Sequence, residues 1–265
     1  MITKKEALSV VFSCAPEYKN NLAEKSLLFV CTDKHKRVHC LEVTFDAGNF
    51  QHMTGLKTDK SAITPSHFFE LCMDKRLREE DFEFAEDGTT PLKLTVLPGL
   101  VKKNLSANML GDYNMSQPKL YTEKIAGGVK ACVGFVRNGG TGRYVPNTVL
   151  QGDIRQKVIH PDRIILTYRK KRGDEKYSEI VYKAKKVDWS KIKLPEEYKY
   201  LPLFTEPENN AAKQKPMPVS VKHGIEIVNA IETYRDLEWS DEQIVVKLIQ
   251  RFGLTDEEAL EQLKI

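Results

Sequence analysis

The sequence lacks several patterns that would assign a function directly. No stretch of its 265 residues approaches the ~18 uncharged apolar residues that a membrane-spanning helix requires. The basic start of the chain is interrupted by Glu6, and the apolar run after it is short, so we expect no secretory signal. We therefore predict a cytoplasmic protein without a membrane partner. The sequence also has no phosphate-binding glycine loop and no nucleophile elbow.

The cysteines and histidines show no metal-binding spacing. The five cysteines are scattered without a Cys-x-x-Cys pair, and the six histidines form neither a His-x-x-x-His nor a His-Glu-x-x-His pattern. These spacings are the usual signature of zinc sites, and an odd, dispersed set of cysteines does not indicate a disulfide framework. We predict no metal site and no cofactor.

The net charge of +4 is unevenly distributed along the chain. Residues 1–204 hold 34 basic and 25 acidic residues, a net charge of +9, whereas residues 205–265 have a net charge of −5. Residues 151–190 alone hold 11 basic and 6 acidic residues. A basic body favours a polyanionic partner, with nucleic acid ahead of a membrane surface. Basic hairpins also keep edge strands soluble, so this signal is not specific.

Apolar periodicity predicts an α+β fold with N-terminal helices packed on a small twisted antiparallel sheet. Helices are expected over residues 4–25, with a break at Pro16, over residues 66–75 and over residues 92–105. Strands are expected over residues 26–32 and 38–45, and then in a series between residues 119 and 187 that includes 154–161. Helices followed by a run of short strands are typical of α+β proteins and not of alternating βαβ folds.

The C-terminal part has a different composition. Residues 205–220 are rich in Pro and Asn with few apolar residues, which predicts a linker. Residues 221–265 contain three helix candidates, and capping boxes begin at Ser240 and Thr255. We therefore predict a domain over residues 1–204, a linker, and a small acidic three-helix tail over 221–265 that is a candidate for docking a protein partner.

His52 is the first candidate for chemistry. It lies in the stretch GNFQHMTGL, two residues before Thr54, where the apolar strand 38–45 gives way to a polar turn. A histidine near the surface at the end of a rigid element suits proton transfer, because its pKa lies close to ambient pH. The alternative is a histidine that caps the turn or packs under the next helix.

Polar residues on the predicted sheet could complete a site that binds a phosphate and moves protons without a metal. Together with His52 and Thr54, the candidates are Lys124, Thr148 and Arg155. Cleavage of a phosphodiester by the RNA 2′-hydroxyl needs a base, an acid and cations for the phosphorane oxygens. The structural alternative is that Lys124 and Arg155 form surface ion pairs with their neighbours Glu123 and Asp153.

Five segments in order along the chain resemble a known nuclease family. They are FQHMTGL, MLGDYN, KLYTEKIAG, GFV and YVPNTVL followed by DIR, and the resemblance as a whole covers about residues 25–186. The pattern is similar to the fourth group of phage nucleases in the Barnase–EndoU–colicin–RelE-like superfamily, which occurs in bacterial mobile elements. The resemblance implies N-terminal helices against a small twisted antiparallel sheet and a metal-independent RNase.

Carried to this sequence, the resemblance implies a role for each candidate. His52 is the general acid or base. Thr54 binds phosphate oxygens and Asn147 contacts a base or ribose. Lys124 and Arg155 stabilise the phosphorane, with Thr148 beside them on the phosphate oxygens. The sequence offers no second histidine in an obvious partner motif, so Tyr121, a candidate for substrate contact, or Glu123 remains open as the other proton carrier.

Three functions follow from these observations. The first is an endoribonuclease of a phage or mobile element, toxin-like, that cleaves RNA by 2′-hydroxyl transesterification. The second is a nucleic-acid-binding protein that keeps the basic sheet without the chemistry, with RNA favoured over DNA. The third is an interaction protein, such as an inhibitor of a host defence complex, in which residues 221–265 are the active part. Fold alone does not separate them.

Overall fold

The computed structural model describes residues 2–114, 121–203, 231, 240–252 and 254–263. The chain divides into two compact units, Met1–Glu206 and Pro207–Ile265. The predicted linker over residues 205–220 and most of the first predicted tail helix lie outside the described residues. The two units are therefore described separately.

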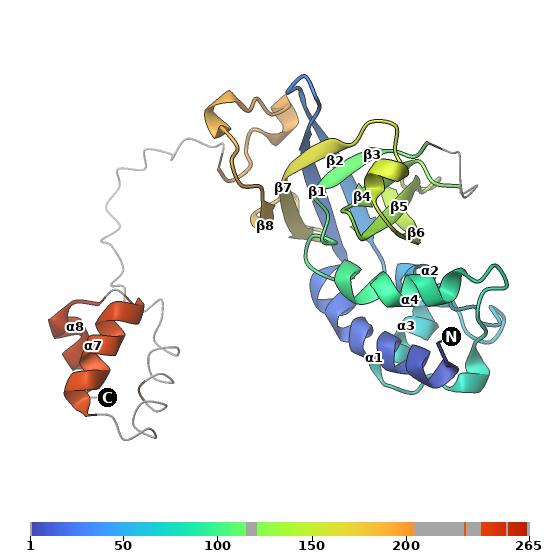
Figure 1. Ribbon diagram of the computed structural model, residues 1–265, viewed down its shortest axis with the longest axis horizontal. Helices are drawn as coiled ribbons and strands as arrows, with labels where there is room; N and C mark the ends of the chain where they lie inside the picture. Colours follow the sequence, from blue (N-terminus) through green and yellow to red (C-terminus); the bar gives the residue numbers. More distant parts are fainter. Residues whose placement is uncertain (1, 115–120, 204–230, 232–239, 253, 264–265) are drawn as a thin grey trace. The chain divides into compact units, whose positions relative to one another are not determined.

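Four helices pack together in the first unit: α1 (Lys4–Asn21), α2 (Asn49–Thr54), α3 (Pro65–Met73) and α4 (Thr89–Leu100). The short 3-10 helix η1 (Glu79–Asp81) lies between α3 and α4 in sequence. A capping box starts α1, because Thr3 and Glu6 each accept a hydrogen bond from the backbone N–H of the other. The tertiary contacts link α1 to α2, α3 and α4, so the helices form one layer (Figure 1).

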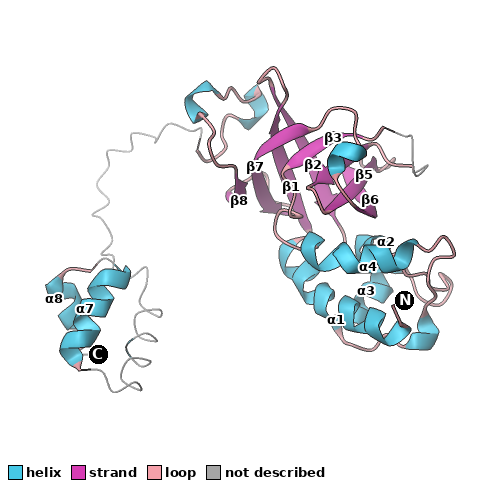
Figure 2. Ribbon diagram, viewed as in Figure 1, coloured by secondary structure: helices cyan, strands magenta, loops and turns pink. Residues whose placement is uncertain are grey.

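The strands form a single sheet of eight members. They are β1 (Lys25–Thr32), β2 (Val38–Phe45), β3 (Met109–Asp112), β4 (Lys124–Gly127), β5 (Ala131–Arg137), β6 (Tyr144–Gln151), β7 (Asp162–Lys171) and β8 (Glu179–Lys183). The strand order is β1-β2-β6-β5-β4-β3-β7-β8, and β1 also pairs with β7. This extra pairing closes seven strands into a ring, with β2 and β6 joined by one parallel bridge between Val43 and Tyr144. Figure 2 shows the curled sheet above the helices.

The main core lies between the inner side of the curled sheet and the helices. Phe29, Phe45 and Phe135 meet edge to face inside the sheet, and all three side chains are buried. A second core on the other side of β1 and β7 is covered by the segment after β8, which contains η3 (Trp189–Lys191) and η4 (Glu196–Tyr198). The predicted α+β class is confirmed, and the sheet is more extensive and more closed than predicted.

Three local predictions were wrong. Helix α1 continues through Pro16 instead of breaking there, because Cys14, Ala15 and Tyr18 are buried against the other helices and their packing offsets the missing backbone hydrogen bond. Residues 154–161 form no strand; they begin with the 3-10 helix η2 (Ile154–Gln156), which Asp153 caps. Helix α4 begins three residues before the predicted start at residue 92 and ends at Leu100.

The second unit is described over two helices, α7 (Asp241–Phe252) and α8 (Asp256–Gln262). The predicted capping box at Ser240 is confirmed, since Ser240 and Gln243 exchange hydrogen bonds between side chain and backbone. Ile244, Leu248, Leu254 and Ala259 form a small core of their own together with Ile231. Within the described residues of both units, no helix has the length and apolarity needed to span a membrane.

Candidate functional site

His52 lies on the solvent side of the short helix α2. The helix is bounded by a turn in which Asn49 accepts a hydrogen bond from the backbone of Asp46, and by Gly55, whose φ of 74° closes the C-terminus. Phe50 and Met53 are fully buried and anchor one face of the helix, which is worth about 1.5–3 kcal/mol for each side chain. His52 therefore projects away from the core. The histidine follows a strand as predicted, but it belongs to a helix and not to the turn.

A pocket of about 280 Å³ surrounds this histidine. Its charged and amide-bearing lining residues come from α2 and the loop after it, from the turn before α4 and α4 itself, and from β6: Gln51, His52, Lys57, Lys60, Asp87, Lys93 and Asn147. We call it the His52 pocket. Three lysines against one aspartate leave the pocket electropositive, which favours an anionic ligand.

Lys57 and Lys60 line one side of the His52 pocket, and backbone hydrogen bonds hold this segment in place. Lys57 exchanges two backbone hydrogen bonds with Glu83, at 2.9 and 2.8 Å, so the chain beyond Gly55 is held in place. Lys60 follows in the next turn, and both lysine side chains are exposed. Their charges lie close enough to His52 to influence its titration.

Lys93 of helix α4 lines the His52 pocket from another side. Thr90 donates a hydrogen bond of 2.9 Å to the carbonyl of Gly55, which ties the start of α4 to the end of α2. Lys93, one turn further along α4, lies directly over Gly55: a Cβ at that glycine would be 2.8 Å from Cδ of Lys93. Glycine is thus needed at residue 55 both for its positive φ and for the space that the lysine stem fills.

The protein environment shifts the pKa values of His52 and Lys93 in the same direction. Loss of hydration lowers the pKa of His52 below its usual value although the ring reaches solvent, and the charges of Lys57, Lys60 and Lys93 lower it further. Partial burial also lowers the pKa of Lys93, while Asp87 opposes this effect. A neutral imidazole beside a lysine that gives up a proton more readily is an arrangement suited to acid–base chemistry on an anion.

Asn147 enters the pocket from a β-bulge. Gly134 of β5 pairs with Thr148 and Phe135 pairs with Pro146, so Asn147 has no partner residue on β5. Its amide is held by the loop before β4, since the carbonyl oxygen accepts from Thr122 Oγ1 at 3.2 Å and the nitrogen donates to the carbonyl of Tyr121. The structure therefore brings together His52 and Asn147, two of the predicted site residues, and connects the backbone of Tyr121 to Asn147. The side chain of Tyr121 is 83% exposed.

Thr54 and Thr148 are buried. The hydroxyl of Thr54 donates to the carbonyl of Gln51 at 2.8 Å and accepts from the N–H of Leu56 at 3.1 Å. Thr148 is 6% exposed and packs beside Gly134 in the sheet. Both hydroxyl side chains therefore lie among neighbouring protein atoms.

Lys124 and Arg155 each contact a carboxylate. Lys124 forms an ion pair with Asp112 on the neighbouring strand β3, and not with Glu123. Arg155 pairs with Asp153, and its hydrogen bonds to that carboxylate hold the pKa of Asp153 below its usual range. Neither residue lines the His52 pocket. Glu123 accepts a hydrogen bond from the hydroxyl of Tyr144 at 3.3 Å.

The three lysines of the pocket were missed at the level of sequence. Lys57 and Lys60 directly follow the motif around His52, so their position in the chain was a usable signal. Lys93 could not be found in this way, because it reaches the pocket only through the packing of α4 on Gly55. Among the described residues, no three His, Cys, Asp or Glu side chains gather as a metal-binding group.

These features define an α+β protein with an electropositive histidine pocket at the junction of helices and sheet. The family model described as phage-Barnase-EndoU-ColicinE5/D-RelE like nuclease 4 matches residues 11–186. The chain belongs to this family, and the match confirms the resemblance seen in the sequence motifs. No curated protein and no solved structure matches the chain. The family description indicates a nuclease of the Barnase–EndoU–colicin–RelE type, which implies a nucleic-acid substrate.

Proposed function

We propose that the protein is a metal-independent endoribonuclease of a phage or mobile element that cleaves RNA through the ribose 2′-hydroxyl. The observation that carries this proposal is the His52 pocket, where one imidazole with a lowered pKa faces three lysines. Such a site suits a substrate that carries its own nucleophile and a phosphate next to it. RNA meets both requirements, whereas DNA lacks the hydroxyl.

In this mechanism His52 is the general base. Its lowered pKa keeps the imidazole neutral at pH 7, so that it can take the proton of the 2′-hydroxyl. The 2′-oxygen then forms a bond to phosphorus, and the bond from phosphorus to the 5′-oxygen breaks. The products are a 2′,3′-cyclic phosphate and a free 5′-hydroxyl.

The lysines would stabilise the phosphorane and supply the second proton. Lys57 and Lys60 lie at the open side of the pocket, where their charges balance the developing negative charge on the phosphate oxygens. Lys93 is the candidate for the general acid, because partial burial lowers the pKa of its ammonium group toward the working pH. It would protonate the leaving 5′-oxygen, the role that the sequence left open between Tyr121 and Glu123.

Asn147 and Tyr121 would contact the substrate. The amide of Asn147 is held in a fixed orientation at the wall of the pocket, where it can hydrogen-bond to a base or ribose. Tyr121, whose backbone carbonyl accepts a hydrogen bond from this amide, has an exposed ring that offers a surface on which an unpaired base can stack. The predicted roles of Thr54, Thr148, Lys124 and Arg155 in phosphate binding remain predictions.

The first experiment is cleavage of labelled total RNA and tRNA by the purified full-length protein in the presence of EDTA. We expect cleavage that survives EDTA and leaves 2′,3′-cyclic phosphate ends. RNA binding without cleavage by the wild-type protein would favour the non-catalytic alternative. Cleavage that stops in EDTA would contradict the metal-independent mechanism.

A further inference from the structure

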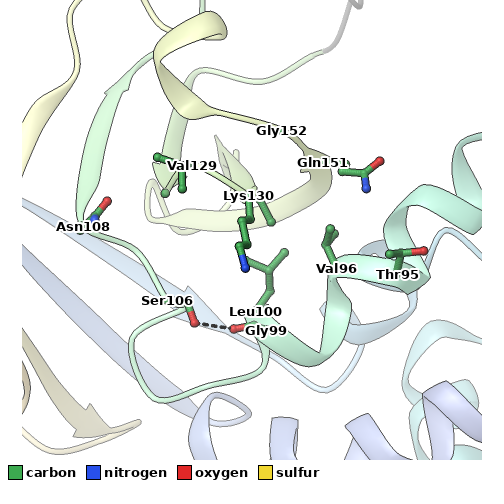
Figure 3. A pocket seen from close by; sticks show the side chains of 12 residues that line it. Thr95, Val96, Gly99, Leu100, Ser106, Asn108, Val129, Lys130, Gln151 and Gly152 are labelled. Carbon is green, nitrogen blue, oxygen red and sulfur yellow. Dashed lines mark hydrogen bonds between the residues drawn. The ribbon is translucent and has the colours of Figure 1, made fainter.

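A second cavity of about 600 Å³ lies beside helix α4 and is not used by the proposed reaction. Its walls include Val96 and Leu100 of α4 and Val129 and Ala131 from the turn and start of β5. Figure 3 shows the amide of Asn108 at one end of this cavity and that of Gln151 at the other. We call it the α4–β6 cavity.

The α4–β6 cavity and the His52 pocket share the same two walls. On helix α4, Lys93 lines the pocket, whereas Thr95 and Val96 line the cavity. On strand β6, Asn147 lines the pocket and Gln151 lines the cavity. Four residues of strand extend roughly 13 Å, about the length of two nucleotides of a stretched single strand. A single-stranded RNA bound at His52 can therefore continue between α4 and β6 into the α4–β6 cavity.

At its other end the cavity meets a basic groove. Asn108 lines both the cavity and a groove of about 470 Å³ formed with Met109, Arg163, Tyr182, Lys183 and Lys185. We call it the β8 groove. Arg163 is fixed there by a hydrogen bond of 2.6 Å from its guanidinium to the carbonyl of Lys185. In the part of the chain that the structure describes, none of these three cations forms an ion pair with a carboxylate, and the groove has no acidic lining residue.

We propose that these three sites form one path for single-stranded RNA, with the scissile phosphate at His52, an unpaired base in the α4–β6 cavity, and backbone phosphates in the β8 groove. The proposal rests on the proposed function and extends it to the substrate on one side of the cleaved bond. The apolar walls suit the face of a base, and the amides of Gln151 and Asn108 can bond to its edges. The cations of the groove, which form no ion pair with a carboxylate among the described residues, suit phosphates.

The shape of the path selects single strands. A base must leave its stack to enter a cavity bounded on one side by a helix and on the other by a strand. Sequence-specific recognition of RNA generally targets such unstacked bases, and duplexes present their edges in grooves that side chains read poorly. Unpaired loops are therefore the expected targets, and the bases of intact duplexes are excluded.

Gly99 allows a direct test. It lines the cavity, and a Cβ at this position would meet no atom within 4 Å, so a larger side chain can fill the space without a clash at its first carbon. We compare Gly99→Phe with the matched control Gly99→Ala, and use Gln151→Ala as a second variant at an exposed residue. The probe is a fully 2′-O-methylated, single-stranded oligonucleotide of about ten nucleotides, which has no 2′-hydroxyl to react.

Fluorescence anisotropy should show that Gly99→Phe weakens binding at least about tenfold, that Gln151→Ala weakens it less, and that Gly99→Ala leaves it unchanged. A Lys183→Gln/Lys185→Gln variant should weaken binding, and the slope of log affinity against log salt concentration should fall by the amount expected for about two lost phosphate contacts. The control Lys5→Gln/Lys103→Gln, which changes two other exposed lysines, should leave the affinity and this slope unchanged. Unchanged binding by both Gly99→Phe and Gln151→Ala would overturn the path.

The same variants separate this proposal from the proposed function. If wild-type protein cleaves unmodified RNA but Gly99→Phe and Gln151→Ala both bind the probe normally, the endoribonuclease stands and the path fails. If wild-type protein binds the probe through the cavity but cleaves no RNA, the path stands and the catalytic proposal fails. Absence of probe binding by the wild-type protein would reject the path.

Discussion

The molecule contains two clusters of histidine, lysine and aspartate that differ in electrostatics. In the His52 pocket, three lysines surround a histidine with a lowered pKa. At the far ends of the strands, His39 lies 3.4 Å from Asp162, and Lys124 contacts Asp112. Burial and the nearby Asp33 and Asp112 raise the pKa of Asp162, although His39 and Lys124 oppose this shift. We call these four residues the His39 cluster.

The comparison shows that residue type alone does not make a phosphate site. The histidine and the lysine of the His39 cluster each have a carboxylate partner, so the cluster offers little attraction to another anion. The lysines of the His52 pocket share one aspartate, Asp87, whose carboxylate also accepts two hydrogen bonds from Thr89 at the start of α4. The excess of positive charge is what distinguishes the candidate site.

The largest expected effect separates the two histidines. His52→Ala should lower the rate of RNA cleavage by about 10²–10⁴-fold, because it removes the proposed general base. His39→Ala should keep a rate near that of the wild-type protein. The measurement is single-turnover cleavage of a labelled RNA, with circular dichroism to verify that both variants fold. If His39→Ala lost cleavage and His52→Ala kept full activity, the active site would have to be assigned to the His39 cluster.

The second effect separates two lysines. Lys93→Ala should lower the rate about 10²-fold, because it removes the proposed general acid. Lys124→Ala should have a smaller effect, since Asp112 already compensates its charge. The rates are measured at saturating RNA so that weaker binding does not mask the result. A larger loss at Lys124 would support its predicted role at the phosphorane.

A third prediction concerns pH. A general base acts in its neutral form, so activity should rise with pH through the pKa of His52. Because this pKa is lowered, the acidic limb should lie below about pH 6.5, the usual value for histidine. Lys57→Gln/Lys60→Gln removes two of the charges that lower it, and the limb should shift to higher pH. NMR titration of His52 should report the same direction, and a shift to lower pH would contradict this electrostatic account.

Much of the fold could be predicted from local patterns, and the exceptions have physical causes. Continuous apolar runs located β1 and β7, because consecutive residues in the middle of both strands are buried, and β2 was located after the polar turn that follows β1. The pairing of β1 with β7 could not be predicted, since it joins residues far apart in sequence. Pro16 misled the prediction, because tertiary packing maintains a helix that its local propensity disfavours.

The site residues could be predicted where they lie close together in the sequence. His52 was identified from its place after a strand, and Lys57 and Lys60 lie within eight residues of it. Asn147 was identified beside a proline, but the bulge that directs it to the pocket depends on the register between β5 and β6. Lys93 required knowledge of how α4 packs on α2. Contacts between distant segments therefore set the limit of prediction at this site.

The smallest expected effect is on stability, and it concerns two glycines with positive φ: Gly55 at the end of α2 and Gly88 just before α4. Gly55→Ala and Gly88→Ala should each cost about 1–2 kcal/mol of unfolding free energy, because alanine disfavours φ of 74° and 69°. At Gly88 a Cβ meets nothing within 4 Å, whereas at Gly55 it would press on Lys93. Urea unfolding should therefore show similar losses, with the larger at Gly55.

RNA cleavage distinguishes the two glycines more clearly than stability does. Gly55→Ala should displace the stem of Lys93 and lower the cleavage rate, while Gly88→Ala should retain activity at temperatures where it is folded. Gly55→Ala in a Lys93→Ala background should add little further loss, because the two changes act through the same side chain. Additive losses would mean that Gly55 acts on the site by a route other than Lys93, such as the orientation of His52 at the end of α2.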